Sequence, residues 1–221
     1  MTRSTIANLE LAPGIIRTPF TILIDKAEKH PWTFDGLSAR SFIDKEMREY
    51  SVKTEASYLG IGRGDYSIAG FQDKVAIERK SMRDFQGTLL GWPHDISNPE
   101  ECYQWDTRKS LHRRGRFKNE LRTLQSLECR AVIVEASLED CIANCEQWGK
   151  RTANENAKYL HSTFISWTQQ FRVPFYFGDR RFAEVTAFRI FEQFWDRHRT
   201  EFRKRQQERR QEQRQLTAIT I

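Results

Sequence analysis

The sequence lacks several features that would place it in common classes of protein. No apolar run approaches the about 20 residues of a membrane-spanning helix, and the N-terminus lacks the basic-then-apolar pattern of a signal peptide. The four cysteines form no CxxC pair, and no histidine stands close enough to them to complete a zinc site. We therefore expect buried free thiols, no membrane association and an intracellular, reducing location. The cysteines are Cys102, Cys129, Cys141 and Cys145.

Two further kinds of site are excluded by spacing. No two of the five histidines stand four residues apart, so no helix offers a histidine pair to a metal. Gly60, Gly62 and Gly64 lie close together, but no Gly-Lys-Ser/Thr follows them. Their pattern therefore excludes a phosphate-binding loop of the P-loop type.

The composition is that of a polar globular chain with a basic excess. Of the 221 residues, 38% are hydrophobic and 30% are charged, and the formal net charge is +6. This length suits one domain with a sizeable core, for which fifteen Phe and six Trp supply large side chains. A basic excess favours a polyanionic partner such as a nucleic acid.

Short β-rich runs alternate with amphipathic helical patterns along the chain. The runs that predict strands are 20–25, 52–59, 66–69, 75–78, 131–135 and 173–177. The patterns that predict helices are 81–90, 117–127, 138–147, 160–171 and 185–195. Residues 36–49 fit either a short helix or an ordered loop. This order of elements predicts an α/β fold with a mixed central β-sheet flanked by helices.

The domain boundaries follow from segments that lack these patterns. We expect an irregular N-terminal arm over 1–18, one folded domain over 19–195 and a polar Arg/Gln-rich tail over 196–221. Inside the domain, 91–114 combines turn-forming residues with several cations, which indicates a long basic loop. The tail has no apolar stripe and suits a solvated segment, with a continued helix or nucleic-acid binding as alternatives.

One stretch concentrates residues that carry chemistry. Asp65 begins the first strand of a predicted hairpin, and Glu78-Arg79-Lys80 ends the second. Because side chains alternate along a strand, Glu78 and Lys80 share one face, and Arg79 lies on the other with Val75 and Ile77. The hairpin brings Asp65 close to Glu78.

An aspartate, a glutamate and a lysine in this arrangement suffice for phosphodiester hydrolysis. Two nearby carboxylates repel each other unless a cation relieves the repulsion. Mg²⁺ suits such a pair because it combines a few carboxylates with water and phosphate oxygens. Lys80 would orient or deprotonate the attacking water, or stabilise the charged phosphate. The spacing alone equally fits a surface hairpin with a cross-strand charge pair, an interaction of small energetic value.

The identity of the neighbouring residues extends the pattern. Gly64-Asp65-Tyr66, followed by Glu78-Arg79-Lys80-Ser81 and Asp84, resembles the GDY…ERK-x3-D signature of the XPF family of structure-specific DNA endonucleases. That family belongs to the restriction-endonuclease-like PD-(D/E)xK superfamily. Asp25 with Glu28 resembles the D-x-x-E that opens the family domain, and Gly115-Arg116-Phe117 resembles its Gly-Arg-aromatic step into a helix.

The resemblance implies roles for these residues and a class of substrate. Asp65 and Glu78 would bind Mg²⁺, or Mn²⁺ in its place, with Asp25 as a further ligand. The other roles it implies are a catalytic Lys80, a supporting Arg79, and motif support from Glu28, Ser81 and Asp84. The family cuts branched or flapped DNA in repair and recombination and pairs its nuclease domains, so a homodimer is implied. Its tandem helix-hairpin-helix module does not follow residue 195, which leaves junction targeting to the basic loop, the tail or a partner.

Cations clustered around the predicted basic loop are the candidates for contact with DNA phosphates, because clustered positive charge is typical of backbone binding. These cations are Arg108, Lys109, Arg113, Arg114 and Arg116. A solvated loop is the alternative. The sequence as a whole predicts a metal-dependent DNA endonuclease. The alternatives are a non-catalytic DNA-binding or scaffold protein on the same fold, and a restriction- or recombination-type nuclease with another DNA substrate.

Overall fold

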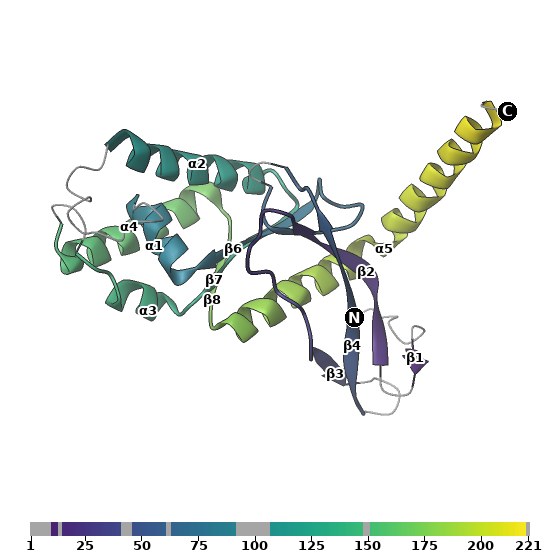
Figure 1. The fold of residues 1–221 in the computed structure, drawn as a ribbon, viewed down its shortest axis with the longest axis horizontal. Coiled ribbons are helices and arrows are strands. Elements are labelled where there is room, and N and C mark those ends of the chain that lie inside the picture. Colours follow the sequence, from purple (N-terminus) through teal and green to yellow (C-terminus); the bar gives the residue numbers. More distant parts are fainter. Residues whose placement is uncertain are drawn as a thin grey trace.

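The computed structural model describes residues 10–12, 15–40, 46–60, 63–91, 107–147 and 151–219, which form a mixed β-sheet with helices on its faces (Figure 1). The strands are β1 (Glu10–Ala12), β2 (Ile15–Asp25), β3 (Ser38–Arg40), β4 (Met47–Ser57), β5 (Tyr66–Ile68), β6 (Val75–Ser81), β7 (Cys129–Glu135) and β8 (Phe175–Phe177). The helices are α1 (Met82–Leu90), α2 (Thr107–Gln125), α3 (Leu138–Ala143), α4 (Ala153–Phe171) and α5 (Arg180–Ile219). The predicted α/β class is confirmed.

The sheet joins two parallel blocks through one short antiparallel strand. Its strand order is β3-β4-β2-β5-β6-β7-β8, with β1 paired to β2. Strands β2 and β4 run parallel, and so do β6, β7 and β8. Strand β5 pairs antiparallel with both β2 and β6, so the predicted β5–β6 hairpin is confirmed. As a result, the ends of β2 and β6 lie on either side of the residues that precede β5.

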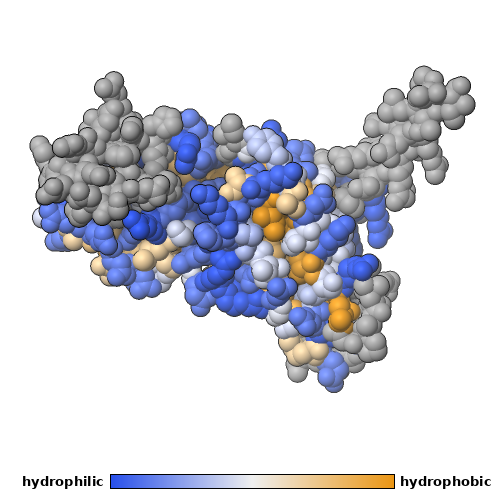
Figure 2. All heavy atoms as spheres, viewed as in Figure 1, coloured by the Kyte–Doolittle hydropathy of each residue, from blue (hydrophilic) through white to orange (hydrophobic). Residues whose placement is uncertain are grey.

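Alternation along the strands divides the core into two layers. Val75 and Ile77 of β6 and Ile133 of β7 pack on the side covered by α5. Ala76 and Val134 lie in the other layer, with side chains from α1, α2 and α4. Strand β7 is therefore buried on both faces, as its continuous apolar sequence predicts. Figure 2 shows that the visible surface around this core is largely hydrophilic, in keeping with the composition.

The N-terminal boundary differs from the prediction. Strand β2 begins at Ile15 rather than near Phe20, and β1 occupies 10–12, so these parts of the predicted arm belong to the sheet. Ile16, Thr18 and Phe20 are all buried, which is the period of two expected for a half-buried strand. Pro19 concealed this extension, because a residue without an N–H interrupts a ladder. The β2–β4 register does shift between Arg17 and Thr21. Residues 1–9 and 13–14 lie outside the described residues.

The described residues of the segment 36–49 contribute two strands rather than a helix, and 41–45 lie outside the described residues. Strand β3 covers Ser38–Arg40 and pairs with the start of β4, which begins at Met47, earlier than the predicted residue 52. The predicted C-terminal strand is also shorter, since β8 covers only Phe175–Phe177. Weak hydrophobic patterning made 36–49 ambiguous, and pairing with neighbouring strands decided its conformation.

The predicted basic loop and tail are both partly helical. Helix α2 begins at Thr107, so the four cations at 108, 109, 113 and 114 stand on a helix instead of a loop, while 92–106 lie outside the described residues. Helix α5 is 40 residues long and continues through the predicted tail to Ile219. Figure 1 shows its C-terminal half extending away from the body. The segment 180–219 contains neither Gly nor Pro and is rich in good helix formers, which favours one continuous helix.

Two expectations from the composition can be compared with the described residues. Cys129, Cys141 and Cys145 are free thiols, of which the last two are buried, and Cys102 lies outside the described residues. In the same part of the chain, no helix combines the length and the apolar character that crossing a membrane requires.

Candidate active centre

Gly64 allows the backbone just before β5 to lie close to the backbone of β6. Its φ is +78°, and a Cβ at this position would lie 2.8 Å from the carbonyl oxygen of Ile77. This close approach lets the Asp65 N–H donate to the Ile77 oxygen at 2.9 Å. The Asp65 carbonyl in turn accepts from the Asp25 N–H at 2.8 Å. Asp65 is therefore fixed by its backbone between β2 and β6.

Asp65 and Glu78 form a pair of interacting carboxylates, of which Glu78 is buried and Asp65 is half-buried. The Arg79 N–H donates to Asp65 Oδ2 at 2.7 Å, which holds the aspartate beside the peptide that follows Glu78. Burial, and after it the negative charge of Glu78, raises the pKa of the Asp65 carboxyl well above its ordinary value. Burial also raises the pKa of Glu78, against the opposing charge of Lys80. The centre thus holds negative charge that the fold disfavours.

Lys80 lies among three carboxylates. Its Nζ is 2.5 Å from Glu78 Oε1, 3.3 Å from Asp84 Oδ2 and 3.9 Å from Glu120 Oε2. The ammonium also stands 4.8 Å from the centre of the Phe117 ring. Burial alone would lower the pKa of Lys80, but the charge of Glu78, supported by those of Asp84 and Glu120, outweighs it and raises the pKa. Lys80 is therefore held as an ammonium in this arrangement.

Arg79 occupies the opposite face of β6, as predicted by alternation. Its Nε and Nη2 donate to the two oxygens of Glu135 at 2.9 and 2.5 Å, and its Nη1 lies 3.3 Å from Glu28. The same Glu135 carboxylate accepts from Trp32 Nε1 at 2.7 Å and from Arg180 at 3.0 Å. Burial would raise the pKa of Glu135, but hydrogen bonds from Arg79 and Trp32 lower it on balance. Arg79 thus anchors the end of β6 to Glu135 of β7, and Glu135 in turn holds Arg180 at the start of α5.

The predicted metal ligand Asp25 makes structural hydrogen bonds. Its Oδ1 accepts from the Ala27 N–H and its Oδ2 from the Leu59 N–H, both at 2.8 Å. These bonds close the turn after β2 and tie it to the end of β4. Its role as a third metal ligand stays a prediction.

The motif-support residues are brought to the same region. Ser81 is the N-cap of α1, and its hydroxyl accepts from the Asp84 N–H at 3.1 Å, as predicted for a capping pair. The Asp84 carboxylate is the one that approaches Lys80. Glu28, besides its contact with Arg79, accepts from the His30 N–H at 2.6 Å. These residues shape the surroundings of Lys80 and Arg79 on the two faces of β6.

Glu120 is a member of the centre that the sequence reasoning missed. It stands on α2 and approaches Lys80 from an element separated in sequence from β6. The sequence does contain a signal for this residue. Glu120 is three residues after Phe117 and adjacent to Leu121, so it borders the apolar face of the helix. Arg116 pairs with the same carboxylate at 3.6 Å and is 58% exposed.

Of the predicted DNA-contacting cations, two have described side chains. Arg116 stands beside Glu120, and the Arg114 guanidinium lies 5.0 Å from the centre of the Tyr159 ring. The side chains of Arg108, Lys109 and Arg113 lie outside the described residues. The proposed contacts with DNA therefore stay predictions for all five.

The donor set fits a magnesium ion held by two carboxylates. In the described part of the chain, no group of three or more His, Cys, Asp or Glu side chains is arranged to hold a metal. Asp65 and Glu78 each use one carboxylate oxygen for the hydrogen bonds to Arg79 and Lys80 given above. Mg²⁺ is commonly bound through one or two carboxylates, with water and substrate phosphate oxygens completing its octahedron. Two carboxylates with raised pKa values are a suitable pair for such an ion.

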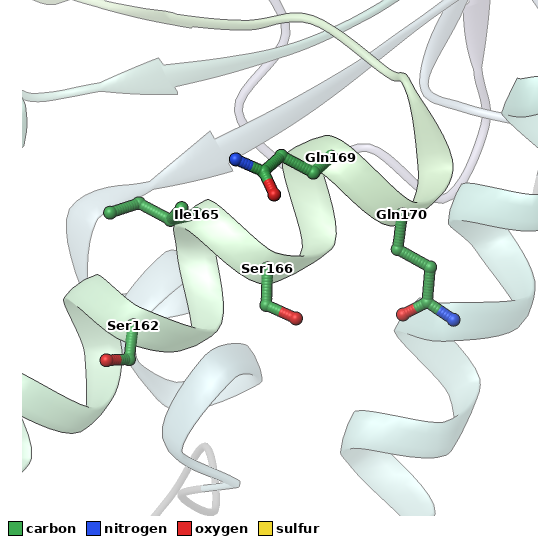
Figure 3. Close-up of a pocket in the computed structure, with 5 residues that line it drawn as sticks. All are labelled: Ser162, Ile165, Ser166, Gln169 and Gln170. Carbon is green, nitrogen blue, oxygen red and sulfur yellow. The ribbon is translucent and has the colours of Figure 1, made fainter.

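A shallow hollow elsewhere on the surface has no catalytic character. Figure 3 shows its five lining residues, all of which project from α4. They are Ser162, Ile165, Ser166, Gln169 and Gln170. None of these side chains titrates near neutral pH, so the hollow offers no general acid or base.

Comparisons with solved structures identify similarity at the level of the fold. The chain is similar to a solved structure of XPF from Aeropyrum pernix, with a TM-score of 0.42 and 18% sequence identity over 83% of this chain and 69% of that one. No family model and no curated protein matches the sequence. A functional interpretation therefore depends on the residues of the centre.

Proposed function

We propose that this protein is a metal-dependent DNA endonuclease that hydrolyses phosphodiester bonds. The observation that carries the proposal is the burial of Glu78 and Lys80, which are 7% and 8% exposed, beside Asp65, which directly precedes the neighbouring strand β5. A surface hairpin with a solvated charge pair would leave these side chains in water. Burying charged groups is costly even when they are paired, and such buried, perturbed titratable groups cluster at functional sites, so the arrangement supports a catalytic centre.

Asp65 and Glu78 are the residues that would hold Mg²⁺ in this centre. The ion, when bound, would lower the pKa of a water molecule and offset negative charge on the phosphate. The Arg79 N–H holds Asp65 Oδ2, and the Arg79 guanidinium is held by Glu135, so the two carboxylates are positioned before substrate arrives. Such preorganisation is the main contribution that a protein makes to phosphoryl-group chemistry.

Lys80 supplies positive charge at the same place. Glu78 holds its ammonium 2.5 Å away, within the layer that contains Phe117. From this position the ammonium would donate a hydrogen bond to a phosphate oxygen or to the attacking water as negative charge develops. Lys80 is the catalytic residue of the proposal, whereas Arg79 is a positioning residue.

Branched or flapped DNA is the proposed substrate, and a homodimer the proposed assembly. Both rest on the resemblance of Gly64-Asp65-Tyr66 and Glu78-Arg79-Lys80-Ser81 to the signature of structure-specific endonucleases. A polar chain with net charge +6 is compatible with a DNA partner.

The test is cleavage of flap, fork, four-way and linear duplex DNA in Mg²⁺ by wild type, by Glu78→Gln and by Glu139→Gln. Glu139 is an exposed carboxylate on α3 and serves as the matched control. We expect Glu78→Gln to lower the cleavage rate by roughly a thousandfold, since it removes a negatively charged metal ligand from the centre. Glu139→Gln should cut like wild type. If wild type and Glu78→Gln are equally inert on every substrate, the protein is not an endonuclease of this kind.

A further inference from the structure

A row of cations on α2 lies over aromatic side chains of α4. Arg114, Lys118 and Arg122 are spaced four residues apart, so they are neighbours along one side of the helix. Arg114 lies 5.5 Å and Lys118 5.4 Å from the centre of the Trp167 ring. Arg122 lies 5.9 Å from the ring centre of Phe171. Three successive turns of α2 thus present a positive charge along the boundary with α4.

A fourth cation extends this row at the start of α4. Arg151 lies 4.2 Å from the centre of the Tyr159 ring, and Arg114 lies 5.0 Å from the same ring. Arg114 also donates a hydrogen bond to the Tyr159 hydroxyl. We call Arg114, Lys118, Arg122 and Arg151 the cationic ridge. Its members come from α2 and from the residue just before the N-cap of α4, and Tyr159 joins them.

The charge of the ridge is not neutralised by described carboxylates. No ion pair within 4 Å connects any of its members to an Asp or Glu in the described part of the chain, whereas Lys80, Arg116 and Arg181 all have such pairs. Arg122 donates instead to the neutral Asn119 Oδ1 at 2.6 Å. Glu155, the acid near Arg151, uses its carboxylate in the capping box with Thr152. Among the described residues, the ridge therefore keeps its positive charge for an external anion.

The aromatic residues beneath the ridge hold the cations and do not themselves offer a binding surface. Trp167 is only 4% exposed and Phe171 only 2% exposed, so their rings cannot stack on a base. Arg122 and Arg151 are exposed, and Arg114 and Lys118 are half-buried. A ligand would consequently meet guanidinium and ammonium groups rather than ring faces. Those groups suit the phosphates of a nucleic acid backbone and carry no information on base sequence.

The ridge is connected to the candidate active centre by a rigid element. Phe117 and Glu120, on the same helix α2, contact Lys80 from other sides of the helix. Because an α-helix is only about 10 Å across with its side chains, one DNA strand passing over α2 can reach both the ridge and the centre. Arg116, which is exposed beside Glu120, stands on the side of the centre.

We propose that the cationic ridge binds the sugar–phosphate backbone of DNA next to the site of cleavage, without regard to base sequence. The proposal rests on the endonuclease function, for which it names the surface that holds the substrate. Three of its four residues, Lys118, Arg122 and Arg151, lie outside the set that the sequence predicted for DNA contact.

The test is the affinity of a fluorescein-labelled flap DNA, measured by anisotropy in EDTA between about 50 and 200 mM NaCl. The variant Lys118→Gln/Arg122→Gln removes two ridge charges. The matched control, Arg17→Gln/Lys53→Gln, removes two exposed cations from β2 and β4. We expect the ridge variant to bind roughly tenfold more weakly at the higher salt and to lower the slope of log K against log salt by about 2. The control should match wild type.

A charge-preserving variant separates binding from packing. Lys118→Arg/Arg122→Lys should keep wild-type affinity and salt slope if positive charge is what DNA contacts. Circular dichroism should show that all three double variants are folded. Unchanged affinity and slope in the folded Lys118→Gln/Arg122→Gln variant would overturn the proposal, as would equal losses in the ridge variant and the control.

Binding in EDTA also distinguishes the ridge from the proposed function. If wild type cuts no substrate but the ridge variant selectively loses binding, the ridge stands and the endonuclease proposal fails. If wild type cuts DNA while the ridge variant binds it normally, the ridge proposal fails alone. A wild-type protein that binds no DNA at all would refute the ridge.

Discussion

The Arg79 guanidinium and the Glu135 carboxylate face each other with two parallel hydrogen bonds of 2.9 and 2.5 Å. This geometry fixes the orientation of both groups and is the strongest form of a protein ion pair. It joins the ends of the parallel strands β6 and β7, where Ser81 stands opposite Glu135 in the register. Through the Arg79 N–H, the same residue holds Asp65. The structural pair on one face of β6 thereby supports the candidate centre on the other.

Replacing Glu135 should give a pH-dependent loss of stability. The pKa of Glu135 is lowered in the folded protein, so its stabilising contribution is full above the unfolded pKa of about 4.3 and is lost as pH falls through the folded value. We expect Glu135→Gln to lower the free energy of unfolding by about 3 kcal/mol at neutral pH, since Arg79 loses the nearer of its two carboxylate partners. The difference from wild type should shrink in acid. Denaturant titrations across this range measure it, and a deficit that does not change with pH would contradict the assignment.

Replacing Asp65 should stabilise the metal-free protein. The pKa of Asp65 is raised by burial and by Glu78, so its charge opposes folding once the pH exceeds the unfolded pKa of about 3.9. In EDTA near neutral pH we expect the free energy of unfolding of Asp65→Asn to be about 1 kcal/mol higher than that of wild type. The hydrogen bond is retained, because the amide oxygen can still accept from the Arg79 N–H. The advantage should vanish in acid.

Mg²⁺ should reverse this order. Thermal unfolding with increasing Mg²⁺ should raise the Tm of wild type, because a ligand that binds only the folded state stabilises it. Asp65→Asn should show little or no increase. Two results would count against Asp65 as a ligand. One is an Asp65→Asn protein that is less stable than wild type in EDTA, and the other is a rise in Tm with Mg²⁺ as large as that of wild type.

The buried pair of Glu78 and Lys80 should show strong energetic coupling. Lys80→Met leaves Glu78 buried without its nearest cation, and we expect a loss of about 3 kcal/mol in unfolding free energy. Adding Glu78→Gln removes the stranded charge and should recover most of this loss. A double-mutant cycle of denaturant titrations measures the coupling, and additive effects of the two substitutions would show that the pair is solvated.

Gly64 and Gly115 should respond to alanine with opposite signs. At Gly64, φ is +78° and an added Cβ would lie 2.8 Å from a backbone oxygen, so we expect Gly64→Ala to destabilise the protein by about 3 kcal/mol. Gly115 stands inside α2 with nothing within 4 Å of an added Cβ. Gly115→Ala should therefore stabilise the helix by about 1 kcal/mol. A tolerated Gly64→Ala would show that the hairpin does not depend on this close approach.

The sequence by itself was sufficient for the local features of the centre. Alternation along 75–81 assigned Glu78 and Lys80 to one face and Arg79 to the other, because the side-chain period of a strand does not depend on distant residues. The hairpin and the Ser81 cap were predictable for the same reason, since both arise from interactions within a few positions. The α/β class followed from the order of the apolar patterns.

Only the tertiary structure decided which distant residues surround the two faces of β6. Glu120 of α2 approaches Lys80 on one face, whereas Glu135 of β7 meets Arg79 on the other and accepts from Trp32 of the segment after β2. No local pattern sets the distances of these residues to β6. The cationic ridge likewise exists because α2 packs beside α4, which brings Lys118 over Trp167. The stretch from Asp65 to Lys80 therefore determined the charged residues and the faces they occupy. Long-range packing determined their burial, their partners and the exposed cations beside them, because the register between elements is set by the whole core.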